Sequence, residues 1–197
     1  MVNIDYKLLA SAIEHYRQFG FIQTELPWFI PKFMMFKQPI FNSFVLTEGK
    51  HRADNASLIG SAEQSFVYLA STNQLISDRL YMAITPCFRD DELDELHYPQ
   101  FMKLELFKFG QVTYEQAKDD SKSLLSFARD LFRKFTNLDK NINIANTTQG
   151  YDLMLDDIEI GSYYANKFVI LDEFPRTAFY SCGTGLALPR FNIARGY

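Results

Sequence analysis

Apolar side chains recur with the 3.6-residue period of an α-helix in two parts of the chain. The first part predicts a helix over residues 5–19, which ends at Gly20. The second predicts a longer helix over residues 113–137, and its start matches a capping box formed by Thr113 and Gln116. The apolar stripe of this longer helix consists of Ala117, Leu124, Leu125, Ala128, Leu131, Phe132 and Phe135.

Short apolar or alternating runs predict strands in much of the remaining chain. Residues 21–29 are aromatic and apolar around Pro27, which indicates an extended segment at an edge or an interface. Residues 30–56 are loop-like. The order of elements favours an α+β fold, an antiparallel sheet flanked by helices, in one domain over residues 1–197. Further strands are predicted at 58–61, 84–89, 101–109, 141–145, 151–155, 158–163 and 178–182, and further helices at 63–71, 73–80 and 185–195.

Residues 85–110 form two strands joined by an acidic loop, and they carry the first candidate site. The second strand alternates, so that Phe101, Lys103 and Glu105 share one face with Phe107 and Phe109. The first strand delivers Arg89 opposite that face. An aromatic ring, a cation and a carboxylate side by side suit a flat base, a phosphate and an ammonium group, respectively. The same pattern also describes any half-exposed strand, with Arg89 in an ordinary ion pair with Asp90 or Asp91.

Two later segments carry further candidate chemistry. Glu159 and Ser162 supply a carboxylate and a hydroxyl that suit Mg²⁺ bound through nucleotide phosphates, if a bulge at Gly161 turns both to one face. The run CGTGLALPRF places Gly183 and Gly185 before Arg190, which allows a close approach of backbone to a ligand. A glycine turn before a helix is the simpler interpretation of that run.

Charge and composition limit the class of protein. The net charge of −4 argues against a protein whose main task is to grip a nucleic-acid backbone, because that affinity comes largely from Lys and Arg. The sequence has neither a run of 18 apolar residues nor a signal-peptide pattern at its start. We therefore expect a soluble, cytoplasmic protein. Its two cysteines, Cys87 and Cys182, do not form a disulfide framework.

Two of these segments resemble signature motifs of a known family. FRDD at 88–91, followed by HYPQFMKLELFKF at 97–109, resembles the second motif of class II aminoacyl-tRNA synthetases, and GTGLALPR at 183–190 resembles their third motif. The seryl-tRNA synthetases are the most similar members. The resemblance covers roughly residues 57–192 and extends more loosely to Pro27, where the class carries its dimer-forming first motif. It implies the class II fold, ATP and Mg²⁺ as cofactors, and a homodimer.

The resemblance assigns five residues to ATP. It implies that Arg89 holds the α-phosphate, Asp91 meets the adenine amino group and Phe101 stacks on adenine. Arg190 would lie over the other face of adenine near the γ-phosphate. His97 stands where seryl enzymes usually carry an arginine for the γ-phosphate, and because a neutral imidazole has no charge, weaker pyrophosphate binding is expected. Asp91 is one methylene shorter than the usual glutamate.

The amino-acid side of the site is implied in the same way. Glu105 and Thr184 match residues that meet the serine amine and hydroxyl, and the run Ser61-Ala62-Glu63 resembles the TxE loop beneath the substrate ammonium. Glu159 and Ser162 match the pair that binds Mg²⁺ in seryl enzymes.

A zinc site is a further, less favoured implication of the resemblance. One branch of seryl-like enzymes, which includes stand-alone ligases that load carrier proteins, binds Zn²⁺ through two cysteines and a glutamate. Cys87 and Cys182 lie beside the two signature motifs, although no third ligand can be assigned.

The implied reaction is ATP-dependent activation of a small amino acid, serine first, to an aminoacyl-adenylate. The family's helical arm for tRNA precedes the catalytic domain, whereas this sequence starts at the catalytic part, and the loop DDELDEL would repel phosphates. We therefore expect transfer to an acceptor other than conventionally bound tRNA, such as a carrier protein or a small molecule. Two alternatives stay open: tRNA aminoacylation with a partner subunit, and a non-catalytic paralogue that binds nucleotide or amino acid.

Overall fold

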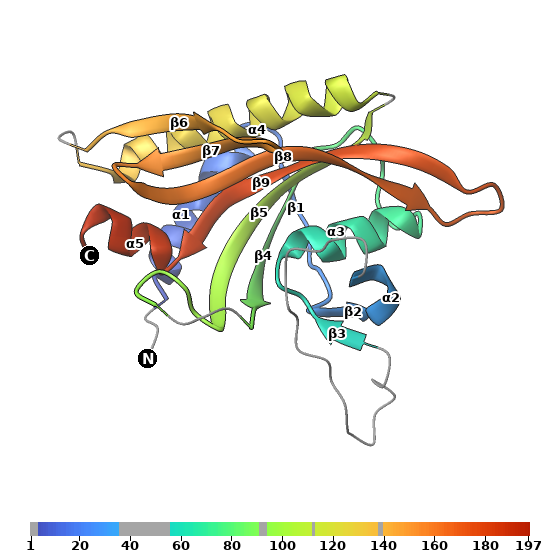
Figure 1. The fold of residues 1–197 in the computed structure, drawn as a ribbon, viewed down its shortest axis with the longest axis horizontal. Coiled ribbons are helices and arrows are strands. Elements are labelled where there is room, and N and C mark those ends of the chain that lie inside the picture. Colours follow the sequence, from blue (N-terminus) through green and yellow to red (C-terminus); the bar gives the residue numbers. More distant parts are fainter. Residues whose placement is uncertain (1–3, 36–55, 91–93, 112, 138–139) are drawn as a thin grey trace, which may run out of the picture.

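The computed structural model describes residues 4–35, 56–90, 94–111, 113–137 and 140–197. Within these ranges the largest feature is a twisted sheet of seven strands in the order β1-β4-β5-β9-β8-β7-β6 (Figure 1). All neighbouring strands are antiparallel except β1 and β4. The strands are β1 (Ile22–Gln23), β4 (Tyr81–Phe88), β5 (Gln100–Gln111), β9 (Arg176–Leu188), β8 (Ile158–Ile170), β7 (Gly150–Leu155) and β6 (Ile142–Asn146), beside a small sheet of β2 (Phe29–Pro31) and β3 (Ala56–Leu58).

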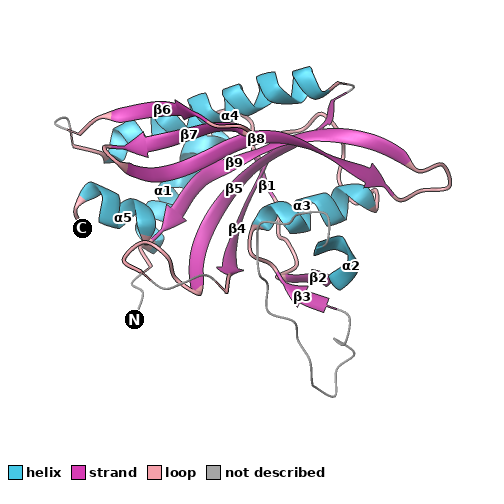
Figure 2. Cartoon of the chain, in the orientation of Figure 1, coloured by secondary structure: helices cyan, strands magenta, loops and turns pink. Residues whose placement is uncertain are grey.

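Helices pack on both faces of the large sheet (Figure 2). One face is covered by α1 (Tyr6–Arg17) and α4 (Tyr114–Phe135), and part of the other by α3 (Ala62–Ser71), next to α2 (Lys32–Met35). The short α5 (Arg190–Arg195) follows β9 directly. This arrangement is the expected antiparallel sheet flanked by helices. None of the helices in the described ranges has the length and apolar character needed to cross a membrane.

The described residues form two hydrophobic clusters, one on each face of the large sheet, and alternate side chains of β5 belong to one or the other. Leu104 and Leu106 point toward α1 and α4, where they join the larger hydrophobic cluster. Phe107 and Phe109 point to the α3 side, and the ring of Phe107 stacks on Phe66 of α3 with centroids 4.8 Å apart. The predicted common face of β5 is therefore present. Its apolar end lies under α3, and its polar end continues beyond the helix.

Several sequence predictions are confirmed in type but change in extent. The capping box at Thr113 and Gln116 is formed, and α4 begins at Tyr114. The strands expected at 158–163 and 178–182 are longer than predicted. The first, β8, continues to Ile170, and the second, β9, begins at Arg176 and ends at Leu188. Of the residues expected to be loop-like, 30, 31 and 56 belong to the small sheet and 32–35 form a short helix, while 36–55 lie outside the described residues.

Two predicted helices are wrong. Residues 73–80 contain turns rather than a helix. Residues 185–188 belong to β9, so the helix that was expected to start at Gly185 starts only at Arg190. The sequence predicts a turn at these glycines, whereas in the structure they remove side-chain volume inside a strand. A Cβ on Gly183 would overlap the ring of Tyr163, and one on Gly185 would overlap the side chain of Leu104.

A buried histidine joins α1 to α4. The Nε2 of His15 lies 2.9 Å from the carbonyl oxygen of Phe127, and its Nδ1 lies 2.9 Å from the Nζ of Lys134. Both contacts are satisfied when Nε2 carries the proton and Nδ1 accepts from the ammonium. Burial lowers the pKa of His15 below 6.5, the Phe127 carbonyl acts in the opposite direction, and the Lys134 charge lowers it further.

This contact predicts a stability loss in mild acid. Because the folded pKa of His15 lies below its unfolded value, the unfolded chain takes up the proton first as pH falls through about 6.5. Urea unfolding between pH 7.5 and 5 should therefore show a steeper loss of unfolding free energy for the native protein than for His15→Gln. The glutamine keeps a donor and an acceptor but does not titrate. Parallel pH curves for the two proteins would contradict this role of His15.

Candidate active site

A cavity of about 290 Å³, lined by both polar and apolar side chains, opens on the face of the sheet that carries α3. Its floor comes from β5, β8 and β9, and its rim from the residues after β4 and the start of α5. The cavity brings together most of the predicted site residues, namely Ser61, Arg89, His97, Phe101, Glu105, Glu159, Ser162, Thr184 and Arg190. Lys103, Tyr164, Gln149, Leu96, Tyr98, Ile160, Ala187, Leu188 and Pro189 complete the lining.

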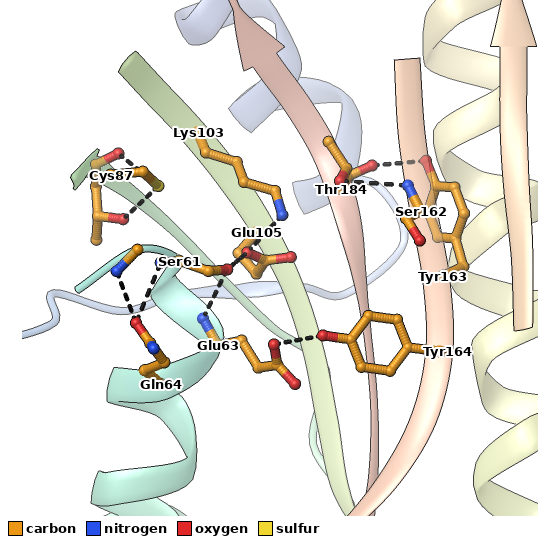
Figure 3. A network of polar contacts seen from close by, with 12 residues as sticks. Ser61, Glu63, Gln64, Cys87, Lys103, Glu105, Ser162, Tyr163, Tyr164 and Thr184 are labelled. Atoms are coloured by element: carbon orange, nitrogen blue, oxygen red, sulfur yellow. Dashed lines mark hydrogen bonds and ion pairs between the residues drawn. The ribbon is translucent and has the colours of Figure 1, made fainter. Parts of the chain in front are cut away.

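The inner end of the cavity is built around the buried carboxylate of Glu105 (Figure 3). Ser61 Oγ donates to Glu105 Oε2 at 2.5 Å, and Lys103 Nζ lies 2.9 Å from the same oxygen. Ser61 is held in place because it is also the N-cap of α3, in a capping box with Gln64. Thr184 lies opposite Glu105 in the β5–β9 ladder, immediately after an irregularity that skips Gly185. A carboxylate with two hydroxyls beside it suits a small polar ligand with an ammonium group.

Glu63 lies behind this wall and does not line the cavity. Its carboxylate is 2% exposed and accepts hydrogen bonds from Tyr164 at 2.5 Å and Tyr180 at 2.6 Å. Burial raises the pKa of Glu63, although the two tyrosine hydroxyls act in the opposite direction. Of the two residues carried over from the TxE resemblance, the structure therefore brings Ser61 into the cavity, whereas Glu63 fixes the wall that includes Tyr164.

Arg89 and Phe101 occupy the other half of the cavity. Phe101 lies two positions before Lys103 on β5, and Arg89 follows the last residue of β4. The Cζ of Arg89 lies 4.9 Å from the centre of the Phe101 ring, and its Nε donates to the carbonyl of Gly60 at 2.9 Å. The guanidinium is thereby held at a fixed place beside an aromatic face. Asp91, the expected adenine contact, lies outside the described residues.

A bulge brings Glu159 and Ser162 to the same cavity, as their proposed shared role requires. In the β7–β8 ladder Leu153 pairs with Gly161 and Met154 with Glu159, so Ile160 is the extra residue next to the expected position. Glu159 Oε1 lies 3.5 Å from Nη1 of Arg190, the first residue of α5. A carboxylate and a hydroxyl can hold Mg²⁺ only together with phosphate and water oxygens. The described residues contain no cluster of three or more His, Cys, Asp or Glu side chains that would hold a metal by themselves.

His97 stands at the rim and is organised by Asp94. The Asp94 carboxylate lies 2.7 Å from Nδ1 of His97 and also accepts the backbone N–H groups of Leu96 and His97. These contacts, led by the hydrogen bond with the imidazole, lower the pKa of Asp94. The carboxylate of Asp94 therefore binds groups within the acidic loop, namely two backbone N–H groups and the imidazole of His97.

The two cysteines are too far apart to share a zinc ion. Cys87 pairs with Phe101 in the β4–β5 ladder, whereas Cys182 pairs with Phe107 in the β5–β9 ladder. Six residues of an extended strand separate the two positions by roughly 20 Å. Both thiols are buried, and burial raises the pKa of Cys87 to about 11 and that of Cys182 further above its usual range. The candidate zinc pair is therefore wrong.

Sequence reasoning gave no role to several residues that line the cavity. Tyr164 lies two positions after Ser162 on β8, so alternation would have identified it had the strand been extended beyond residue 163. Gln149 lies in the turn between β6 and β7, and no local pattern connects that turn with the cavity. Lys103 was on the predicted face without a role of its own.

Comparisons with known proteins reveal the fold. No protein-family model matches the sequence, and no curated protein matches it. Solved structures do match: pyrrolysyl-tRNA synthetase from Desulfitobacterium hafniense has a TM-score of 0.67 at 18% identity, over 96% of this chain and 68% of that chain. A second structure from that organism, PylSc, a pyrrolysyl tRNA synthetase, has a TM-score of 0.69 at 20% identity with the same coverage.

Seryl-tRNA synthetase from Pyrococcus horikoshii complexed with ATP has a TM-score of 0.74 at 20% identity, over 96% of this chain and 49% of that chain. These similar structures include enzymes for two different amino acids, so the likeness does not distinguish between them. The chain has the fold of class II aminoacyl-tRNA synthetase catalytic domains.

Proposed function

We propose that this protein activates a small amino acid, serine first, with ATP to form an aminoacyl-adenylate. The observation that carries the proposal is the order of side chains along one face of β5. Phe101, with Arg89 beside its ring, lies at one end of the cavity, and Glu105 lies at the other. An adenylate needs an aromatic surface for its base, a cation for its phosphate and a carboxylate for its ammonium, in that order.

The reaction needs no general base, because the substrate carboxylate is already the nucleophile. One of its oxygens forms a bond to the α-phosphorus, and the bond from that phosphorus to the bridging oxygen breaks, so that pyrophosphate leaves with the electron pair. Catalysis then depends on alignment and on neutralising negative charge. In this proposal Arg89 meets the α-phosphate and Arg190 the outer phosphates, while Glu159 and Ser162 would hold Mg²⁺, which would neutralise negative charge on the phosphates.

The size and chemistry of the inner end favour a small amino acid. Ser61, Glu105 and Thr184 are each at most 5% exposed and close this end with two hydroxyls and a carboxylate. The acceptor we propose is not conventionally bound tRNA, since the loop beside the cavity is acidic and one of its carboxylates, Asp94, holds His97 at the rim. A carrier protein or a small molecule remains the proposed acceptor.

The direct test is ATP–pyrophosphate exchange with each amino acid in turn, in the presence of Mg²⁺. Exchange with serine or another small amino acid is the expected result. The second candidate, a non-catalytic paralogue that binds nucleotide, is favoured by the pairing of Glu105 with Lys103, because this pair already neutralises the carboxylate. ATP binding without exchange for any amino acid would select that candidate. Tight binding of tRNA at physiological salt would instead select aminoacylation of tRNA with a partner subunit.

Glu105→Ala should weaken the amino acid more than ATP. A charge-assisted hydrogen bond to a buried carboxylate is worth about 1.5–3 kcal/mol, so the serine KM should rise by roughly 10- to 100-fold. The ATP KM should not rise, because Phe101 and Arg89 lie in the other half of the cavity. Exchange kinetics with each substrate varied in turn measure both effects. Glu14→Ala, which removes an exposed carboxylate paired with Arg17, is the control. Equal losses for both substrates would remove Glu105 from its assigned role.

A further inference from the structure

Lys103 lies between the two halves of the cavity. On β5 it is two residues after Phe101 and two residues before Glu105, and all three line the cavity from the same face. Alternate residues of a strand are about 7 Å apart, so Lys103 is based midway between the proposed adenine and ammonium positions. Its side chain is 12% exposed, and its Nζ is directed toward Glu105 (Figure 3).

The ammonium of Lys103 occupies the position that a substrate ammonium would take. Lys103 Nζ lies 2.9 Å from Glu105 Oε2, and Ser61 Oγ donates to that same oxygen. A substrate ammonium that binds Glu105 would therefore come close to a second full positive charge. Two like charges a few ångströms apart repel strongly in a partly desolvated site. Lys103 has a flexible four-carbon stem, so its ammonium can move away from Glu105. The amine of the substrate is attached directly to the α-carbon, so it has no such freedom once the rest of the substrate is bound.

The reacting groups lie where a displaced Lys103 would point. The substrate carboxylate and the α-phosphate must meet between the adenine on Phe101 and the ammonium on Glu105, and this is the stretch of the cavity above Lys103. Negative charge accumulates there as the new oxygen–phosphorus bond forms and pyrophosphate departs. Arg89 supplies one cation from the end of β4, and a second cation from β5 would approach from the floor of the cavity.

We propose that Lys103 is a catalytic residue that changes partners: the substrate ammonium displaces it from Glu105, and its ammonium then binds the oxygens of the substrate carboxylate and the α-phosphate. This inference rests on the proposed function. The exchange of partners makes amino-acid binding the event that delivers charge to the phosphate, so ATP is not activated before the amino acid is in place. Lys103 keeps its proton throughout, since the step forms and breaks only phosphorus–oxygen bonds.

The charge state of Lys103 fits this role. Burial is the largest single influence and would lower the pKa of Lys103, but the charge and hydrogen bond of the Glu105 carboxylate together with the Cys87 thiol outweigh it, so that the pKa is raised from its usual value. Lys103 is therefore an ammonium at neutral pH, and it acts as a charge and a hydrogen-bond donor rather than as a base or a nucleophile.

The first test compares serine-dependent exchange in the native protein, Lys103→Met and Lys103→Arg. Loss of this cation should lower the kcat of Lys103→Met by about 100-fold, with the ATP KM within about threefold, and Lys103→Arg should recover part of the rate. A residue that merely neutralises Glu105 gives a different result. Its removal would leave kcat within about threefold and lower the serine KM, and that outcome would overturn the proposal.

The second test measures ATP binding by calorimetry and does not require turnover. Glu105→Gln releases Lys103 in the free protein, so ATP should bind about tenfold more tightly to this variant than to Lys103→Met/Glu105→Gln. The double variant also serves as the folding control, because Lys103→Met alone leaves the buried Glu105 without its ion-pair partner. Equal ATP affinities would overturn the role of Lys103, whatever the exchange assay shows. Unequal affinities together with no exchange in the native protein would instead reject the proposed function and leave the change of partners supported.

Discussion

Arg89→Ala is expected to lower the rate of amino-acid-dependent ATP–pyrophosphate exchange by about 100- to 1,000-fold while the fold stays intact. The guanidinium is fixed by its hydrogen bond to the Gly60 carbonyl and its position beside the Phe101 ring, so it needs no reorganisation to meet a phosphate. It belongs to neither hydrophobic cluster, so its loss leaves the core packing in place. The loss should appear mainly in kcat, since the charge matters most when the phosphorus centre reacts.

Two further variants make this result specific. Arg17→Ala removes an exposed arginine that is paired with Glu14 and should leave exchange unchanged. Arg89→Lys retains the charge but loses the planar fork, so an intermediate rate is expected. Undiminished exchange in Arg89→Ala would mean that the chemistry takes place elsewhere on the protein.

Gly183→Ala should destabilise the fold by about 1–3 kcal/mol, the usual cost of adding a carbon to a packed interior. The added Cβ would overlap the ring of Tyr163 on the neighbouring strand. That ring cannot simply move away, because the Tyr163 hydroxyl donates to the carbonyl of Thr184 at 2.6 Å and the side chain is fully buried. Urea unfolding followed by circular dichroism measures the change. Because Thr184 is the next residue, serine binding should weaken as well.

Ser181→Ala is the matched control on the same strand. Ser181 is also fully buried on β9, and within the described residues its hydroxyl has no hydrogen-bond partner. Removing that oxygen should leave stability unchanged or raise it slightly. Equal losses of stability in both variants would show that β9 tolerates no change at all, which would contradict a specific clash at Gly183.

The sequence was most informative where a local pattern determines the structure. The capping box at Thr113 and the alternation of β5 rest on neighbours a few residues away, and both are present as predicted. The glycines of β9 were misinterpreted because their reason lies on another strand, in the ring of Tyr163.

The candidate site also combines features that neighbours in the sequence determine with features that depend on distant segments. The order of Phe101, Lys103 and Glu105 follows from strand alternation alone. The position of Glu63 behind Tyr164 and Tyr180 depends on the packing of α3 against β8 and β9. Likewise, only the register of three strands shows that Cys87 and Cys182 are far apart. Tertiary pairings between distant segments could not be predicted from single motifs.

The place of β9 in the sheet has a consequence for synthesis of the chain. This strand lies between β5 and β8, yet it is the last strand of the described chain and begins only at Arg176. At 5–20 residues per second, a ribosome that has finished β5 needs on the order of 3 to 13 s to reach β9. During that interval Leu104, Leu106 and Phe107 lie on an open strand edge whose partner does not yet exist. We therefore expect nascent chains that stop before residue 176 to aggregate or to be held by chaperones, and the cavity to form only in the final stage of folding.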